Sequence, residues 1–222
     1  GLFTWPLADV ECLNQTISSI QDEGKSHYFL YLPELDAALH KYGTQAHEIE
    51  TKLSWYENEL RHLMEVAQEN YQEVRMNIFS DHGMTDTIDT RDIMQIVEDL
   101  GLAYDKDYVC VYDSTMVRFW FLDRDAKEKI VGALDPEEQG RFLSDQELHE
   151  LGIYWADHRY GDAVFLMKPG VLVMPSYMSK YEVPSGMHGF HPDDASSDGV
   201  FLSNTLPKRK PKAILDIFDL IN

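Results

Sequence analysis

The chain has 222 residues, with 39 Asp and Glu against 19 Lys and Arg, which gives a formal net charge of −20. A surface this acidic repels phosphate backbones, so the composition argues against binding to a nucleic-acid polymer. With 44% hydrophobic and 26% charged residues, the composition is that of an ordinary globular protein of one large domain or two small ones. No apolar run approaches the roughly 20 residues that span a bilayer, and no transmembrane segment is predicted.

The cysteines and the first residues give a weak indication of cellular context. Cys12 and Cys110 are too few for a disulfide framework, and they fit a cytoplasmic environment slightly better than a secreted one. The chain starts at Gly1 without an initiator Met or a signal-like segment. We therefore expect the gene product to begin upstream of residue 1.

The predicted elements alternate between strands and helices. Apolar patterning and turn residues predict these elements in chain order: a buried strand at 26–32, a long amphipathic helix at about 44–71, a strand at 74–79, a helix at 88–100 capped by Thr87, Asp89 or Thr90, a hairpin at 108–122, helices at 123–134 and 143–151, one or two strands at 163–174, a long loop at 184–199, a strand at 199–202 and a helix at 213–220. This alternation predicts an α/β fold with a mostly parallel sheet flanked by helices.

The predicted domain organisation is a core interrupted by an insertion. Residues 104–175 read as a small α+β insertion or cap, and residues 1–103 and 176–222 as the α/β core. In such folds, ligands bind beyond the carboxyl ends of the strands. Polar side chains that follow strands are therefore the first candidates for a site.

Asp36 and His40 follow the first predicted strand and are four residues apart. If the chain turns into a helix there, both side chains fall on one face and can hold one metal ion. Taken alone, the spacing is common, and a surface Asp with a capping or solvent-exposed His is the usual explanation for it.

Asp81, His82 and Gly83 directly follow the second predicted strand. The carboxylate and the imidazole can converge where the strand turns into a loop, and Gly83 suits a tight turn. Such a pair is a donor set for zinc or manganese. The alternative is a turn Asp with a nearby His.

His188 lies between Gly186 and Gly189 in the long late loop. Flanking glycines let the backbone approach closely and expose the imidazole, although a flexible loop with incidental histidines remains an alternative. His191 is undecided. The other histidines singled out have no partner at ligand spacing and are expected to be structural or solvated: His27, His47, His62, His149 and His158.

Together, the three elements resemble the type I phosphodiesterase and nucleotide pyrophosphatase family of the alkaline phosphatase superfamily. The family's D-x-x-G-H segment is matched by residues 31–43, its S-D-H-G-M segment by residues 80–84 and its G-x-H-G loop by residues 186–189. The Trp5-Pro6 dipeptide is similar to a W-P segment of these enzymes. Three motifs in the family's order are a far more specific signal than any one of them.

The resemblance implies an alkaline-phosphatase-like fold and two divalent metal ions, with zinc expected and manganese as the alternative. It implies that Asp36, His40 and His188 hold one ion and that Asp81 and His82 hold the second. The implied substrate is a small phosphate ester, with a nucleotide as one candidate. The resemblance gives no oligomeric state.

The family's nucleophile, a Thr or Ser at a helix start, has no match in this chain, nor has the Asp that accompanies it. We expect both upstream, so that this chain binds one ion well at most and turns over little substrate alone. Leu39, Thr44 and the Leu7-Ala8 pair also depart from the family pattern, at positions that are not ligands.

Several alternatives remain open. Phosphomonoesterases, sulfatases, phosphonate hydrolases and cofactor-independent phosphoglycerate mutases of the superfamily share the metal geometry, and a non-catalytic remnant acting as a binding module is a further alternative. Six aromatic residues of the middle block can stack on a nucleobase, but aromatic residues in strands more often belong to a core: Tyr108, Tyr112, Phe119, Trp120, Tyr154 and Trp155.

Overall fold

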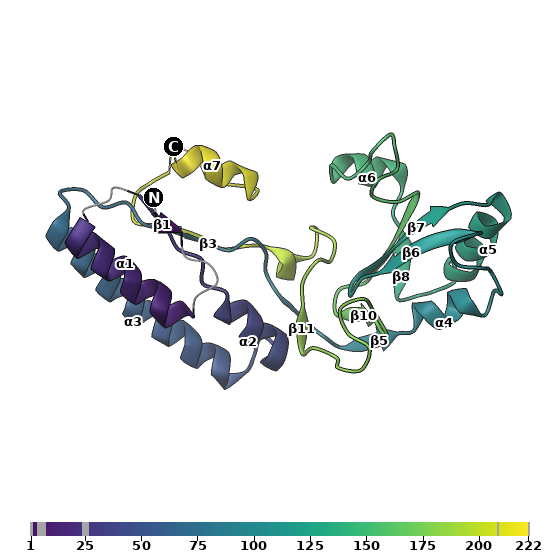
Figure 1. Cartoon of the computed structure of the whole chain (residues 1–222), viewed down its shortest axis with the longest axis horizontal. Coiled ribbons are helices and arrows are strands. Elements are labelled where there is room, and N and C mark those ends of the chain that lie inside the picture. The colour runs from purple at the N-terminus through teal and green to yellow at the C-terminus, as the bar shows by residue number, and fades with distance from the viewer. Residues whose placement is uncertain (1, 4–7, 24–26, 208, 222) are drawn as a thin grey trace. The chain divides into compact units, whose positions relative to one another are not determined.

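A computed structural model of the chain describes residues 2–3, 8–23, 27–207 and 209–221. Trp5 and Pro6, which carry one of the family-like segments, lie outside the described residues. The chain forms two compact units (Figure 1). Unit 1 comprises Gly1–Gly83 and Gly199–Asn222, and unit 2 comprises Met84–Asp198.

Unit 1 is built on a pair of long helices. Helix α1 (Asp9–Glu23) packs alongside α3 (His47–Asn70), and Figure 1 shows the two side by side. The buried residues that join them recur at helical spacing: Leu13, Ile20, Leu63, Val66 and Ala67. The predicted long amphipathic helix is thus confirmed. The short helices α2 (Glu34–Tyr42) and α7 (Leu215–Ile221) complete the helical part of the unit.

Two short strand pairs belong to unit 1. Strand β1 (Leu2–Phe3) runs parallel to β2 (Tyr28–Phe29), and β3 (Asn77–Phe79) runs antiparallel to β12 (Phe201–Ser203). The predicted strand at 26–32 was placed correctly but is not buried, because Phe29 is 46% exposed. Leu30 and Leu32 are partly buried against the α1–α3 cluster and account for the apolar pattern.

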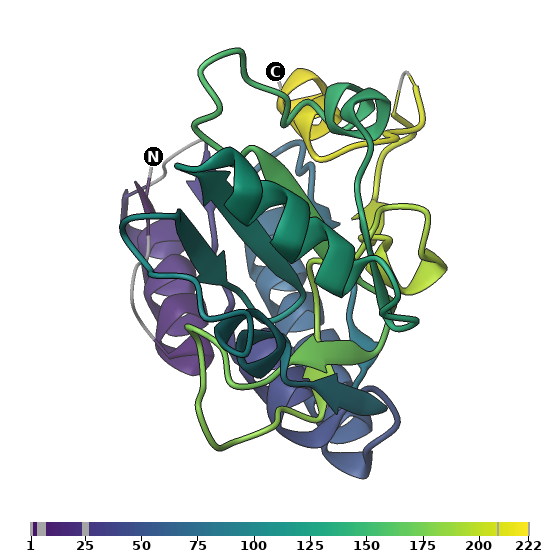
Figure 2. The same cartoon turned by 90° about the vertical axis from the view of Figure 1, so that its right-hand side faces the viewer.

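The core of unit 2 is a four-stranded antiparallel sheet. Its strands follow the order β6 (Tyr108–Tyr112), β7 (Met116–Phe121), β9 (Ala163–Met167) and β8 (Gly140–Phe142). Helix α5 (Arg124–Leu134) lies against this sheet (Figure 2) and buries Ile130 and Leu134. The predicted hairpin, the helix after it and the two strands after residue 162 are confirmed, so the middle block has the predicted α+β character.

Shorter elements surround this sheet. Strand β5 (Asp89–Arg91) runs parallel to β10 (Val171–Val173), and β4 (Thr85–Asp86) runs antiparallel to β11 (Gly186–Met187). The helices that remain are α4 (Ile93–Glu98), α6 (Asp145–Glu150) and the 3-10 turn η1 (Ala195–Ser197).

The predicted start of the helix at residue 88 is wrong. Residues 89–91 form β5, because their backbone pairs with β10, and α4 begins only after Asp92. The Asp92 side chain accepts the backbone N–H of Gln95 at 2.8 Å and is the true cap. Asp89 and Thr90 are residue types that often cap helices, but here they belong to strand β5.

The α/β class is confirmed, but the sheets are small. Among the described strands, two pairings are parallel, β1–β2 and β5–β10, and the others are antiparallel. The parallel arrangement was predicted from the alternation of strands and helices. Strands β6 and β7 follow each other through a short turn with no helix between them, and strands joined in this way pair antiparallel. The compact unit of the structure comprises residues 84–198, and the narrower limits of 104–175 for an insertion stay a prediction.

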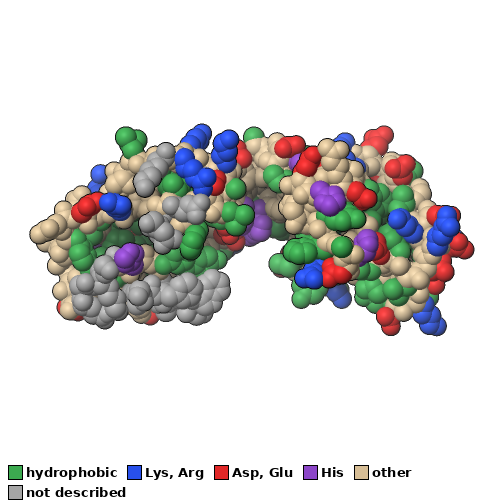
Figure 3. All heavy atoms as spheres, turned by 90° about the horizontal axis from the view of Figure 1, so that it is seen from above, with side chains coloured by type: hydrophobic (Ala, Val, Ile, Leu, Met, Phe, Trp, Pro, Cys, Tyr) green, Lys and Arg blue, Asp and Glu red, His purple; other side chains and the backbone are tan. Residues whose placement is uncertain are grey.

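The surface carries charged side chains of both signs. On the face shown in Figure 3, Lys and Arg side chains are scattered among acidic and apolar ones. Within the described residues, none of the helices has the length and apolar content that a membrane crossing requires. Cys12 and Cys110 are both buried and neither is in a disulfide, and burial raises the pKa of the Cys110 thiol to about 11.

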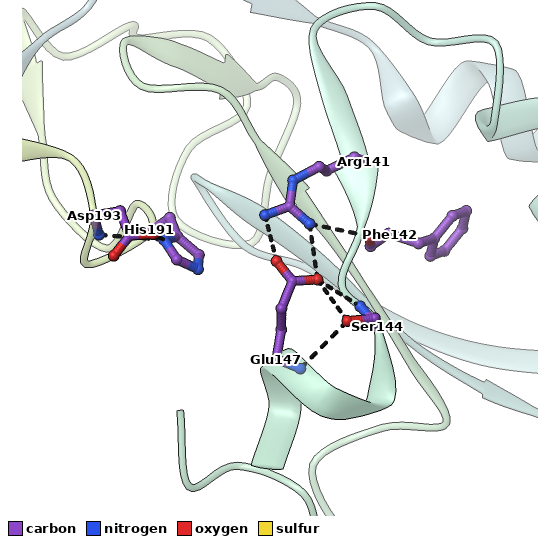
Figure 4. A network of polar contacts seen from close by, with 6 residues as sticks. All are labelled: Arg141, Phe142, Ser144, Glu147, His191 and Asp193. Carbon is purple, nitrogen blue, oxygen red and sulfur yellow. Dashed lines mark hydrogen bonds and ion pairs between the residues drawn. The ribbon is translucent and has the colours of Figure 1, made fainter. Parts of the chain in front are cut away.

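Helix α6 is held by a capping box that is extended by an arginine (Figure 4). The Ser144 hydroxyl accepts the backbone N–H of Glu147, and the Glu147 carboxylate accepts the backbone N–H of Ser144 at 2.9 Å. Arg141 binds the same carboxylate through both terminal nitrogens, at 2.6 and 3.0 Å. These hydrogen bonds, above all the one from Arg141, lower the pKa of Glu147 to about 2.

We predict that Glu147→Gln lowers the free energy of unfolding at pH 7 by about 1 kcal/mol, since it removes the ion pair and weakens the cap. Because the folded state lowers this pKa, the contribution is present above the ordinary value near 4.5 and is lost as the pH falls toward about 2. Urea unfolding of both proteins from pH 7 to pH 4 measures this difference, which should shrink below about pH 5.

The matched control is Glu128→Gln, which removes the more exposed pair with Arg124 at 3.4 Å. It should change the free energy of unfolding by less than about 0.5 kcal/mol. A loss for Glu147→Gln that is no larger than for this control would contradict the assigned cap.

Candidate functional site

Helix α2 presents the first candidate pair. The chain turns into this helix after Pro33, and it ends at Gly43, which takes a φ of 79° and donates its N–H to the Leu39 carbonyl. Asp36 and His40 therefore lie one turn apart on one face, with His40 Nε2 3.5 Å from Asp36 Oδ1. The helix that the spacing required is present, and the two donors converge.

Asp81 and His82 follow β3 and form the second candidate pair. His82 Nε2 lies 3.5 Å from Asp81 Oδ1, so both donors face the same space. The other ring nitrogen, Nδ1, lies 2.9 Å from the Gly83 carbonyl oxygen. Because a carbonyl only accepts, Nδ1 carries the proton, and Nε2 of the neutral ring keeps the lone pair that a metal needs.

Within unit 1 the two pairs meet. Asp36 and His82 each offer a ligand atom within 4.8 Å of the other, so Asp36 is close to both imidazoles. Two ligands that share a tetrahedral zinc ion lie about 3.3 Å apart when each is about 2.0 Å from it. The 3.5 Å separations within both pairs match this value. Within each pair, a carboxylate and an imidazole thus have the spacing of two ligands of one divalent ion, and Asp36 and His82 bring the two pairs within reach of each other.

The end of β3 is held by a segment from near the end of the chain. Ser80 donates its N–H to the Val200 carbonyl at 3.1 Å, and its hydroxyl accepts the N–H of Val200 at 2.9 Å. A Cβ at Gly199 would approach the Ser80 carbonyl to 3.0 Å, so only glycine fits without a shift. Sequence patterning did not identify this clamp, because backbone partners leave no residue-type signal.

His188 lies in unit 2, directly after β11, and is half-buried. The loop around it is anchored: the Thr115 hydroxyl donates to the Gly189 carbonyl at 2.9 Å, and Phe190 is buried. Gly189 takes a φ of 90°, which explains the second of the two glycines. Within unit 2, His188 thus lies on a loop that is anchored by a hydrogen bond and by a buried side chain. Its role as a metal ligand stays a prediction.

The remaining histidines largely behave as expected. His47 and His62 are exposed on α3, and His149 stacks on the Tyr154 ring with 3.9 Å between centroids. Two of them do have a carboxylate partner: His158 Nδ1 lies 3.1 Å from Asp162, four residues away, and His47 Nδ1 lies 3.5 Å from Glu50, three residues away. His191 accepts the backbone N–H of Asp193 at 3.2 Å, as Figure 4 shows.

The aromatic residues of the middle block divide between core and surface. Tyr108 and Phe119 are buried, as expected for a core. Trp155 is 44% exposed, but the Arg159 guanidinium already covers its ring at 4.9 Å. A pocket of about 120 Å³ beside Trp155 and His158 contains none of the predicted metal ligands.

Comparisons with known proteins give a family and a fold. A family model described as type I phosphodiesterase / nucleotide pyrophosphatase matches residues 8–191. Human ectonucleotide pyrophosphatase / phosphodiesterase 5 superposes with a TM-score of 0.76 at 14% identity, over 100% of this chain and 60% of that one. The comparison with curated proteins found no match.

Two structures of the murine protein of the same name are also similar. One superposes with a TM-score of 0.73 at 17% identity, covering 95% of this chain and 56% of the other. An inactive form in complex with AMP gives 0.70 at 16%, covering 91% and 54%. At these identities the likeness shows the fold, and this chain spans a little more than half of the proteins it matches.

We predict that His82→Ala lowers the affinity for zinc by at least about tenfold, because it removes one of the converging donors of unit 1. Titration of the metal-stripped protein with zinc against a chromophoric chelator measures the affinity. His62→Ala, which removes an exposed histidine of α3, is the matched control and should leave it unchanged. Equal losses in both variants would exclude a specific site.

Proposed function

The chain belongs to the type I phosphodiesterase / nucleotide pyrophosphatase family, and from this premise we propose that it contributes the metal centre of a phosphodiester or phosphoanhydride hydrolase. The observation that carries the proposal is the convergence in unit 1 of the two donor pairs, Asp36 with His40 and Asp81 with His82. Membership places the chain in a hydrolase family. The use of metal and the reaction of this chain are what we propose.

The donor set supports two divalent ions, and zinc suits carboxylate and imidazole ligands best, with manganese as the alternative. We assign Asp36, His40 and His188 to one ion and Asp81 and His82 to the other. The assignment of His188 rests on its motif alone. When bound, such ions polarise phosphoryl oxygens and lower the pKa of an attacking oxygen.

The site needs bound cations to accept an anionic substrate, and the residues around it orient the groups that would bind them. Asp36 and Asp81 are carboxylates in a protein with a net charge of −20, and without a cation they would repel a phosphate. The Gly83 carbonyl fixes the proton on Nδ1 of His82 and leaves Nε2 as the donor. The clamp from Val200 to Ser80 holds the segment that carries both groups.

We further propose that the substrate is a small phosphate ester, and a nucleotide is the first candidate. The fold match includes a protein with AMP bound, which supports testing nucleotides first. The nucleophile has no counterpart in this sequence, and we place it upstream. Another hydrolase of the superfamily, such as a phosphomonoesterase, sulfatase or phosphonate hydrolase, is the nearest alternative. A non-catalytic binding module is the other.

We predict that this chain alone binds no more than one zinc ion tightly and hydrolyses a chromogenic nucleotide phosphodiester slowly or not at all. Metal analysis of the dialysed protein and an absorbance assay measure the two quantities. A stoichiometry near two with full hydrolysis would contradict the absence of the nucleophile. Faster release from a phosphomonoester or a sulfate ester would favour another member of the superfamily.

In a polypeptide extended upstream to the predicted nucleophile, we expect His188→Ala to reduce both zinc content and hydrolysis, the latter by at least about tenfold. His149→Ala is the control, since His149 is an exposed histidine of the same unit that stacks on Tyr154. Unchanged metal content and rate for His188→Ala would favour the non-catalytic module.

A further inference from the structure

A fully buried carboxylate lies at the start of α1. The Asp9 side chain is 0% exposed, and an uncompensated charge at such a position costs several kcal/mol, of the order estimated for buried ions. Its Oδ2 accepts a hydrogen bond from the Tyr56 hydroxyl and lies 3.1 Å from Lys52 Nζ. Both partners belong to α3, so the compensation of Asp9 ties α1 to α3.

The same lysine reaches helix α2. Lys52 Nζ donates to Glu34 Oε2 at 2.6 Å, and Glu34 is the first residue of α2. The other oxygen of this carboxylate, Oε1, accepts the backbone N–H of Asp9 at 3.0 Å. Asp9, Glu34 and Lys52 therefore form a closed ring of ion pairs and hydrogen bonds that joins the starts of α1 and α2 to α3.

The ring is protected from water on one side. The Lys52 side chain is only 18% exposed, and its ammonium group lies 4.0 Å from the centre of the Trp55 ring. The carboxylate of Glu34 also lies at the positive ends of two helix dipoles, those of α1 and α2.

Helix α2 lies against α3 but contributes no fully buried residue to the core. All nine of its residues are described, and none of them is buried. A helix without a buried side chain lacks the apolar packing that normally determines helix position. Yet this helix carries Asp36 and His40, which lie two and six residues after Glu34. The polar ring at its first residue is thus a charged restraint on the helix that bears the two ligands.

We propose that Glu34 and Lys52 are positioning residues for the metal site: with Asp9 they fix the first turn of α2 and thereby hold Asp36 and His40 in place for the ion. This inference rests on the proposed function for the identity of the ligand but concerns residues that do not touch it. It assigns a role to a charged network that neither the motifs nor the metal ligands explain.

The test uses Glu34→Gln, which keeps the size of the side chain and an oxygen for the Asp9 N–H but removes the ion pair with Lys52. The expected result is a zinc affinity weaker by about threefold to tenfold, less than for the loss of a direct partner of a ligand. The urea midpoint of unfolding measured in chelator should stay close to that of the unaltered protein, because Glu34 is 45% exposed.

Two further variants separate position from charge. Glu57→Gln removes a carboxylate of α3 that pairs with Arg61 at 2.7 Å, and it should leave zinc affinity unchanged. Lys52→Arg keeps the positive charge and should stay closer to the unaltered protein than Glu34→Gln does. Arginine is chosen at position 52 because a neutral residue there would leave Asp9 buried without its cation and would destabilise the fold.

A second measurement does not need the metal. Hydrogen exchange of the α2 amides in the metal-free protein should accelerate in Glu34→Gln and not in Glu57→Gln. Unchanged affinity and exchange in Glu34→Gln would overturn the positioning role, as would an affinity loss matched by an equal loss of stability in chelator. If the unaltered protein binds no zinc, the proposed function fails, while the exchange rates still decide whether the ring holds α2.

Discussion

The antiparallel pairing of β3 with β12 is the interaction on which unit 1 depends. It joins residues 77–79 to residues 201–203, and it closes a unit whose two parts are separated in the sequence by all of unit 2. Hydrogen bonds from the Asn204 side chain to the Val74 carbonyl and from the Met76 N–H to Asn204 extend the pairing at one end, and the Ser80–Val200 bonds extend it at the other. The segment that bears Asp81 and His82 leaves directly from this fixed end.

The elements that sequence patterning located well are those whose signal is local. Helix α3 has a long apolar stripe, and the β6–β7 hairpin has two runs of apolar and aromatic residues around a turn at Asp113 and Ser114. Strand β5 was missed because its residues are polar and cap-like, and only its distant partner β10 makes it a strand. The burial of β2 was overestimated because a short run of aromatic residues has the same sequence pattern in a buried strand and in an exposed one.

The site shows the same division. Asp36 with His40 and Asp81 with His82 are donor pairs that each have an ordinary alternative explanation, and they suggested a site only when the motifs were taken together in the family's order. The partners that hold them were not predictable. The Gly83 carbonyl, the Val200 backbone and the ring at Asp9 act through groups that every residue has, or through contacts between helices far apart in sequence.

The chain leaves unit 1 after Gly83 and returns at Gly199, and within unit 1 these two points are neighbours because Gly199 lies against Ser80. A closed excursion of this kind has an entropic cost that grows only with the logarithm of its length. Changes in the length of the polypeptide between the two glycines therefore carry little entropic penalty for the helices of unit 1. Residues can be inserted at this position in evolution without altering the connections between α1, α2 and α3.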